Sequence, residues 1–220
     1  MKSDVINLAS VDMPRSLALN EGEPAGETLI SVFRAAKLVS ARGQLFCLVR
    51  SISSLGLTGD LNLALPQGEQ VKVQLGTKFV GATVSASDGS TIELAFEEAI
   101  DVELWLGGPA AERRVAPRVE IDCPARLTLG TQTIFVRVRD ISQEGACIES
   151  DDILLEGDEL TITLRNWKAL RASVAWVEGN LAGLNFARPV ALRELSNWLT
   201  DCTSQAQRMT SEAIQRIARQ

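Results

Sequence analysis

The sequence contains no histidine and no tyrosine among its 220 residues. Without histidine the chain can form neither a Ser-His-Asp triad nor a histidine-ligated metal site, so both kinds of active site are excluded. Basic residues are also in deficit, because 22 Lys and Arg against 28 Asp and Glu give a net charge of −6. An acidic chain of this kind is not expected to bind a nucleic-acid polymer, which needs a basic surface.

Long apolar runs are missing as well. No run approaches the roughly 18 apolar residues of a membrane span, and residues 1–27 contain no continuous apolar core of a signal peptide. We therefore expect a cytoplasmic protein without membrane insertion. Residues 1–27 carry little pattern and are predicted to be a mobile arm.

The four cysteines are scattered and include no CxxC pair. This spacing indicates neither a zinc site nor a disulfide framework. Two of them occur in apolar strand-like runs, where a buried free thiol is common. We expect all four to be reduced structural thiols: Cys47, Cys123, Cys147 and Cys202.

Two parts of the chain resemble each other. Residues 47–57 (CLVRSISSLGL) align with residues 136–146 (VRVRDISQEGA) at an offset of 89 residues, the distance from Ser53 to Ser142. The same offset joins Phe46 to Phe135, and with one inserted residue the match continues to Phe96 and Phe186. Agreement over about 60 residues indicates two tandem domains of one fold, since the unit is too long for a solenoid repeat.

Each unit is predicted to be a small antiparallel barrel or sandwich. Residues 71–75, 92–96, 160–164 and 170–176 alternate apolar and polar side chains, as half-buried strands do. Residues 88–89 and 178–180 carry tight-turn chemistry between such strands. Near the end of the sequence, two apolar stripes have the spacing of a helix. The first is formed by Leu192, Leu195, Trp198 and Leu199, and the second by Met209, Ala213 and Ile217.

Two local features carry candidate chemistry. Residues 112–118 (ERRVAPR) gather Arg113, Arg114 and Arg118 in a loop, because Pro117 forces the preceding residue toward extended backbone. Arginine suits bidentate bonding of phosphates and guanine edges, although a loop of this kind taken alone is more often a solvated basic patch. Residues 140–145 (DISQEG) follow a predicted strand at 133–139, and there a carboxylate and a hydroxyl either bond a ligand or bond their own turn.

Together these features are more specific. Arg114 and Arg118 form RxxxR, and Asp140, Ser142 and Gly145 form DxSxxG about 20 residues later; this combination resembles the PilZ domain. The resemblance covers about 112–200, including a late strand pair at 174–176 and 183–186 and the helix at 190–200.

The resemblance implies six-stranded antiparallel barrels and binding of cyclic di-GMP, a bacterial second messenger. Carried over to this chain, the resemblance implies that Arg114 and Arg118 are the principal residues that bind the nucleotide and that Arg113 is a third. Because Arg113 stands beside Arg114, a stacked pair of nucleotides is an open alternative to a single one. Asp140 would accept hydrogen bonds from guanine, Ser142 would assist, and Gly145 would keep the surface clear for the base.

The first unit departs from this pattern. Arg113, Arg114 and Arg118 correspond to Pro24, Ala25 and Leu29, and Asp140 corresponds to Ser51. We therefore expect the following division of the chain: an arm at 1–27, a degenerate PilZ-like barrel at 28–106, a linker with the arginine loop at 107–118, a PilZ barrel with its helix at 119–200, and a helical tail at 201–220.

The expected function is a non-enzymatic cyclic di-GMP receptor or adaptor without cofactor, metal or catalytic residues. Ligand binding would order the 107–118 linker and change how the two barrels are arranged, and a downstream protein partner would recognise the new arrangement. The sequence is also compatible with a homodimer.

The main alternative is a PilZ-like interaction or assembly protein that binds no nucleotide, for instance in motility or pilus machinery. A hydrolase using carboxylates such as Asp151 and Asp152 is a weaker third reading, since these are more simply solvated turn charges.

Overall fold

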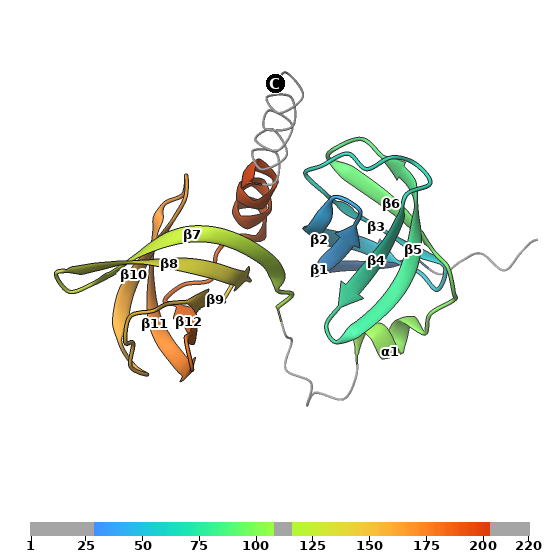
Figure 1. Cartoon of the computed structure of the whole chain (residues 1–220). Helices are drawn as coiled ribbons and strands as arrows, with labels where there is room; N and C mark the ends of the chain where they lie inside the picture. Colours follow the sequence, from blue (N-terminus) through green and yellow to red (C-terminus); the bar gives the residue numbers. More distant parts are fainter. Residues whose placement is uncertain (1–28, 108–115, 203–220) are drawn as a thin grey trace, which may run out of the picture.

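The computed structural model describes residues 29–107 and 116–202, and these consist mainly of β-strands in two closed six-stranded antiparallel barrels (Figure 1). The predicted fold class is confirmed. The predicted arm and nearly all of the predicted tail, including the second helical stripe, lie outside the described residues.

The first barrel is closed by β1 pairing with both β2 and β4, and its strand order is β1-β2-β3-β6-β5-β4. The short helix α1 (Val102–Leu106) follows the barrel. The strands of this barrel are β1 (Ile30–Ser40), β2 (Gly43–Ile52), β3 (Gly56–Asp60), β4 (Gln70–Leu75), β5 (Lys78–Ser87) and β6 (Thr91–Phe96).

The second barrel repeats this topology in the order β10-β11-β12-β9-β8-β7. The C-terminal helix, of which residues 192–202 are described, follows it. The predicted late strand pair is present as β11 and β12. The strands of this barrel are β7 (Val119–Leu129), β8 (Gln132–Ile141), β9 (Gly145–Glu149), β10 (Glu159–Leu164), β11 (Ala169–Glu178) and β12 (Leu181–Phe186).

The two barrels share their irregularities as well as their topology. The pairing of β1 with β2 shifts register between Ser31 and Arg34, and the pairing of β7 with β8 shifts between Glu120 and Cys123. These positions correspond at the predicted offset. A bulge bends a strand and fixes its register, so equivalent bulges show that the duplication extends to the backbone.

The helical predictions are confirmed in part. Leu195, Trp198 and Leu199 are buried against the second barrel, so this stripe packs on the barrel as expected. No helix is predicted for the first unit, yet α1 occupies the equivalent place, with Asp101 as its N-cap accepting from the Leu104 N–H at 2.9 Å. None of the described helices is long and apolar enough to cross a membrane.

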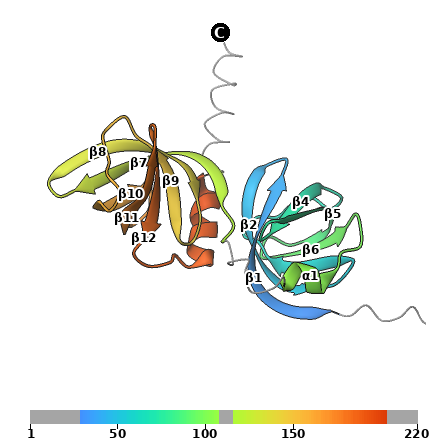
Figure 2. The ribbon, with the colours of Figure 1, turned by 90° about the horizontal axis from the view of Figure 1, so that it is seen from below.

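The barrels meet through the outer face of β2. Phe46 points away from its own barrel, yet it is only 1% exposed because it joins the hydrophobic cluster of the second barrel. Two hydrogen bonds flank this contact: Asn62 Nδ2 to Asn197 Oδ1 at 2.5 Å, and the Glu120 N–H to Gln44 Oε1 at 2.8 Å. Figures 1 and 2 both show β2 beside β7 and the C-terminal helix.

Candidate functional site

Two of the predicted ligand residues contact each other. Arg118 lies directly before β7, and Asp140 lies near the end of the neighbouring strand β8. Arg118 Nη1 donates to Asp140 Oδ1 at 2.6 Å. The antiparallel pairing of β7 with β8 therefore brings the second arginine of RxxxR to the first residue of DxSxxG.

The pair is accessible to solvent. The Arg118 side chain is 45% exposed and that of Asp140 is 26% exposed. An ion pair with this exposure contributes about 1 kcal/mol at most, because water screens it. An anionic ligand with donor groups can thus replace each partner at small cost.

Ser142 is placed differently, since its hydroxyl bonds its own turn. Ser142 Oγ donates to the carbonyl oxygen of Gly145 at 3.3 Å and accepts from the Glu144 N–H at 3.3 Å. The residue is 1% exposed. These contacts give Ser142 a structural role, and its assistance to a ligand stays a prediction.

Gly145 is required by a close approach of two strands. A Cβ atom at this position would collide with the carbonyl oxygen of Leu184 on β12, and one at Gly56 would collide with that of Leu94 on β6. Backbone cannot yield as a flexible side chain can. Because the first barrel has the same requirement without an arginine loop, this glycine is part of the barrel architecture. That Gly145 also keeps the surface clear for a guanine base stays a prediction.

The first barrel lacks the charged pair. At the position of Asp140 it has Ser51, whose Oγ lies 2.6 Å from Thr58 Oγ1 on β3. At the position of Arg118 it has Leu29, which is exposed. Ser53 still bonds Gly56 as Ser142 bonds Gly145. The first barrel therefore keeps the turn and has lost the side chains that could meet an anion.

Comparison with known families decides the identity of the second barrel. Residues 112–201 match the sequence profile of the PilZ domain.

The second barrel is a PilZ domain.

Three solved structures match the larger part of the chain. PlzA of Borreliella burgdorferi in complex with c-di-GMP is 13% identical, over 77% of this chain and 91% of that one, with a TM-score of 0.34. Inhibitor of motility (MotI) of Bacillus subtilis is 13% identical, over 81% and 98%, with a TM-score of 0.34. YcgR of Escherichia coli in complex with c-di-GMP is 15% identical, over 81% and 88%, with a TM-score of 0.32. No curated protein sequence matches the chain.

The other two predicted arginines of the PilZ domain, Arg113 and Arg114, lie outside the described residues. Three residues separate Arg114 from Arg118 in the sequence. Their contribution to a site stays a prediction.

A fourth arginine near the PilZ site was not among the predicted residues. Arg139 donates from Nη1 to Asp122 Oδ1 at 2.9 Å and also pairs with Glu149. In the first barrel the equivalent Arg50 pairs with Asp60, which occupies the position of Glu149. Since both barrels have this bridge between neighbouring strands, we interpret Arg139 as structural. The internal repeat is the signal that could have identified it.

Cys147 lies beside the site, because it pairs with Asp140 in the register of β8 with β9. Burial raises the pKa of its thiol, and the nearby carboxylate of Asp140 raises it further. A thiol with a raised pKa stays protonated and neutral. Cys147 is therefore a buried, neutral thiol beside the site, in keeping with the structural role predicted for it.

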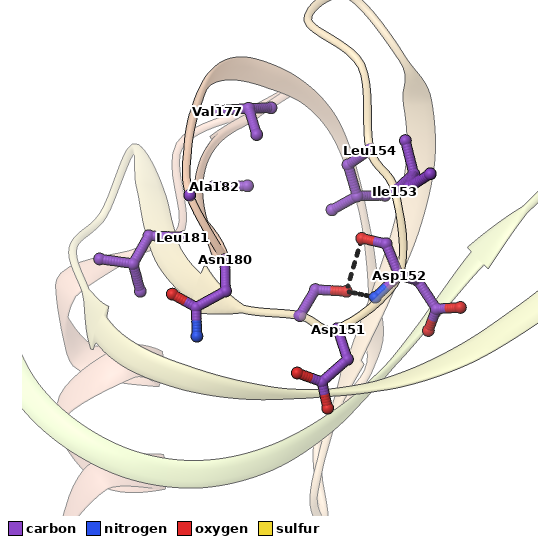
Figure 3. Close-up of a pocket in the computed structure, with 10 residues that line it drawn as sticks. Asp151, Asp152, Ile153, Leu154, Val177, Asn180, Leu181 and Ala182 are labelled. Carbon is purple, nitrogen blue, oxygen red and sulfur yellow. Dashed lines mark hydrogen bonds between the residues drawn. The ribbon is translucent and has the colours of Figure 1, made fainter.

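The PilZ barrel also has a hollow of about 330 Å³ at another edge, between the loop after β9 and the hairpin of β11 and β12. Its lining includes Asp151, Asp152, Leu154, Val177 and other residues, but none of the predicted ligand residues. Figure 3 shows the two carboxylates pointing away from Val177, and both residues are exposed. Their negative charge makes this hollow unsuited to an anion, and they are solvated turn charges as predicted.

No metal site is evident in the described parts of the chain, where no group of three or more His, Cys, Asp or Glu residues could hold an ion. What the PilZ site does offer is a guanidinium and a carboxylate side by side at the edge of a barrel. Such a pair can give hydrogen bonds to acceptor atoms and take them from donor atoms of one planar ligand.

Proposed function

We propose that this chain is a receptor for cyclic di-GMP, which binds at the PilZ domain. The observation that carries the proposal is the contact of Arg118 with Asp140, which joins RxxxR to DxSxxG in space. The ligand residues in this proposal are Arg113, Arg114, Arg118, Asp140, Ser142 and Gly145.

The chemistry of the ligand fits these side chains. Each phosphate carries a negative charge that an arginine can bond in a bidentate manner. Guanine has acceptor atoms on one edge for arginine, and its N1–H and amino group form a donor edge that a carboxylate such as Asp140 can bond. Binding exchanges the ion pair of Arg118 with Asp140 for bonds from each partner to the ligand.

The position of the site supports a change in the arrangement of the barrels. Glu120 lies two residues after Arg118, and its N–H bonds Gln44 of the first barrel. A ligand that draws Arg118 from Asp140 acts on the start of β7, next to this contact. We propose that binding changes how the first barrel packs on the PilZ domain, and that a downstream protein partner reads the new surface.

Isothermal titration calorimetry of the full chain with cyclic di-GMP tests the binding. Wild type is expected to bind, and Arg114→Ala and Asp140→Ala are expected to lose about 10-fold or more, since hydrogen bonds to charged groups are worth about 1.5–3 kcal/mol each. Arg171→Ala, which removes an exposed arginine from β11 of the same barrel, is the control and should bind as wild type does. Absence of heat with wild type overturns the proposal and favours an interaction protein that binds no nucleotide.

Small-angle X-ray scattering with and without cyclic di-GMP tests the rearrangement separately. The expected result is a ligand-dependent change in the profile that Asp140→Ala abolishes. An unchanged profile with saturating ligand would contradict the proposed rearrangement without contradicting the proposal that the chain binds cyclic di-GMP.

A further inference from the structure

One face of the PilZ domain carries an exposed aromatic side chain. Phe135 lies on the outer face of β8 and is 80% exposed. The equivalent Phe46 of the first barrel is 1% exposed, because it packs into the second barrel. A single exposed hydrophobic residue is ordinary on a protein surface. Here, however, the same position of the same fold already forms a contact between two barrels within the chain.

The first barrel leaves this face of the PilZ domain open. Figures 1 and 2 both show the hairpin of β7 and β8 directed away from the first barrel. Phe135 is close to the tip of this hairpin, since β8 begins at Gln132. Ile153, in the loop after β9, is 90% exposed and lines a hollow together with Gln132 and Ile134. Two large hydrophobic side chains near the start of β8 thus contact solvent.

Charges of opposite sign flank Phe135. Arg126 is exposed and pairs with Phe135 in the register of β7 with β8, so their side chains share the outer face. On the other side, Arg137 pairs with Glu149 in the register of β8 with β9. Because side chains alternate along a strand, Phe135 and the exposed Asp151, each two residues further, lie on this same face. A positive charge, an aromatic ring and a negative charge therefore form one row.

The two charges of this row have no counterpart in the described parts of the chain. Neither Arg126 nor Asp151 forms an ion pair with another described residue. In the first barrel the position of Asp151 is held by Asn62, which bonds the neutral Asn197 across the contact between the barrels. The PilZ domain has a charge at the position where the buried face has an amide. A surface that covers it must therefore supply a positive charge.

We propose that this face is the contact of a homodimer, in which two copies of the chain pack the faces around Phe135 on each other. An apolar centre between a positive and a negative charge is self-complementary. A two-fold axis parallel to β8 places Arg126 of each copy opposite Asp151 of the other, and the two Phe135 rings pack beside the axis. A contact of this kind is isologous and closes with two copies.

The structure argues against a head-to-tail arrangement of copies. The position on the PilZ domain that receives Phe46 is filled within each chain, so Phe135 of another copy cannot use it. The proposed contact also leaves the candidate nucleotide site open, because Asp140 lies near the other end of β8, about 17 Å from Phe135 along the strand. The inference does not rest on binding of cyclic di-GMP.

Sedimentation velocity of the full chain without ligand tests for the dimer. The sedimentation coefficient of wild type should rise with concentration from that of a monomer to that of a dimer. Phe135→Asp should raise the dissociation constant about 10-fold or more, because it sets two carboxylates against each other. Phe79→Asp, at an exposed phenylalanine of the first barrel, is the matched control and should associate as wild type does. A wild type that stays monomeric up to about 1 mM overturns the proposal.

A small contact of this kind gives weak association, so the copies are apart at the dilution of an unfolding experiment. Circular dichroism shows that each variant is folded before its association is measured. Association of wild type that Phe135→Asp does not weaken overturns the proposal.

Charge reversal tests the two-fold arrangement. Arg126→Asp gives the face two acidic residues and Asp151→Arg gives it two arginines, so each variant alone should associate about 10-fold more weakly than wild type. A mixture of the two variants should form a heterodimer at concentrations where neither associates alone, since every acid then faces an arginine. A mixture that stays monomeric overturns the proposed dimer.

Discussion

Arg118 Nη1 lies 2.6 Å from Asp140 Oδ1, so two predicted ligand residues are partners of each other across β7 and β8. The arginine that would bond an anion is neutralised by the carboxylate that would bond a guanine. Each is held in place by the other, and neither is left as an uncompensated charge. A ligand that satisfies both at once can exchange with this ion pair.

Replacing Arg118 should therefore affect binding more than folding. Arg118→Ala is expected to lower the free energy of unfolding by less than about 1 kcal/mol, because the pair is exposed. Its affinity for cyclic di-GMP should fall about 10- to 100-fold, through the loss of charge-assisted hydrogen bonds. Urea denaturation and calorimetry measure the two effects. Arg50→Ala removes an exposed, ion-paired arginine from the first barrel and should leave the affinity unchanged; an equal loss there would contradict the assignment.

Phe46 and Phe135 provide a matched pair for the contact between the barrels. They occupy equivalent positions in the two repeats, yet Phe46 is 1% exposed and Phe135 is 80% exposed. Phe46→Ala should destabilise the packing of the barrels by about 3 kcal/mol or more, since it leaves a cavity in the cluster. Phe135→Ala should stay within about 0.5 kcal/mol of wild type.

Urea denaturation measures both variants, and small-angle scattering reports whether the barrels have separated. Separation is expected for Phe46→Ala alone. If the two variants behaved alike, Phe46 would not hold the barrels together.

The glycines of the two turns should show the same structural requirement. Gly145→Ala and Gly56→Ala each place a methyl group against the backbone of a neighbouring strand. Both are expected to lower the free energy of unfolding by about 1–3 kcal/mol, the usual cost of overpacking. Thermal or chemical unfolding measures this loss. Gly107→Ala, with its nearest contact at 3.6 Å, is the control and should be tolerated; a loss confined to Gly145→Ala would show that the requirement is not shared.

The acidity of Cys123 predicts the pH dependence of its alkylation. Its pKa is lowered by the Cys202 thiol and by Arg165, against opposition from burial and from Asp122. Because only the thiolate reacts, its relative rate with iodoacetamide should reach half-maximum at a lower pH than the value of about 8.5 for a free cysteine. Cys47, with its pKa raised to about 12, should not react below pH 10 in the folded chain. Peptide mapping after alkylation at a series of pH values measures both. In Cys202→Ser the half-maximum of Cys123 should move up; an unchanged profile would show that Cys202 is not the cause.

Much of the fold could be predicted because it is written in local patterns. Strand alternation at residues 71–75 and 160–164, turn residues such as Gly89 and Gly179 with positive φ, and the stripe around Leu195 each depend on near neighbours in the chain. The duplication then required that whatever fold the first unit has, the second has too. RxxxR and DxSxxG predicted the side chains of the candidate site through their resemblance to the PilZ domain.

The relationships between distant residues could not be predicted in this way. Equivalent positions in the repeat have the same local sequence context, yet Phe46 is covered and Phe135 is not, because burial depends on what packs against the outer face of a strand. The hydrogen bond of Asn62 with Asn197 likewise depends on where the C-terminal helix docks, which no spacing along the chain encodes.

The sequence by itself thus determined two tandem β domains of one fold and the motifs RxxxR and DxSxxG in only one of them. The reason is that strand alternation, turn chemistry and residue type are properties of short segments. Only the tertiary structure decided that Arg118 meets Asp140, that Phe46 joins the core of the other barrel, and that Asn62 bonds Asn197 of the C-terminal helix. These depend on the register of neighbouring strands and on the docking of elements, where the gain from burying surface is shared by residues far apart in the chain.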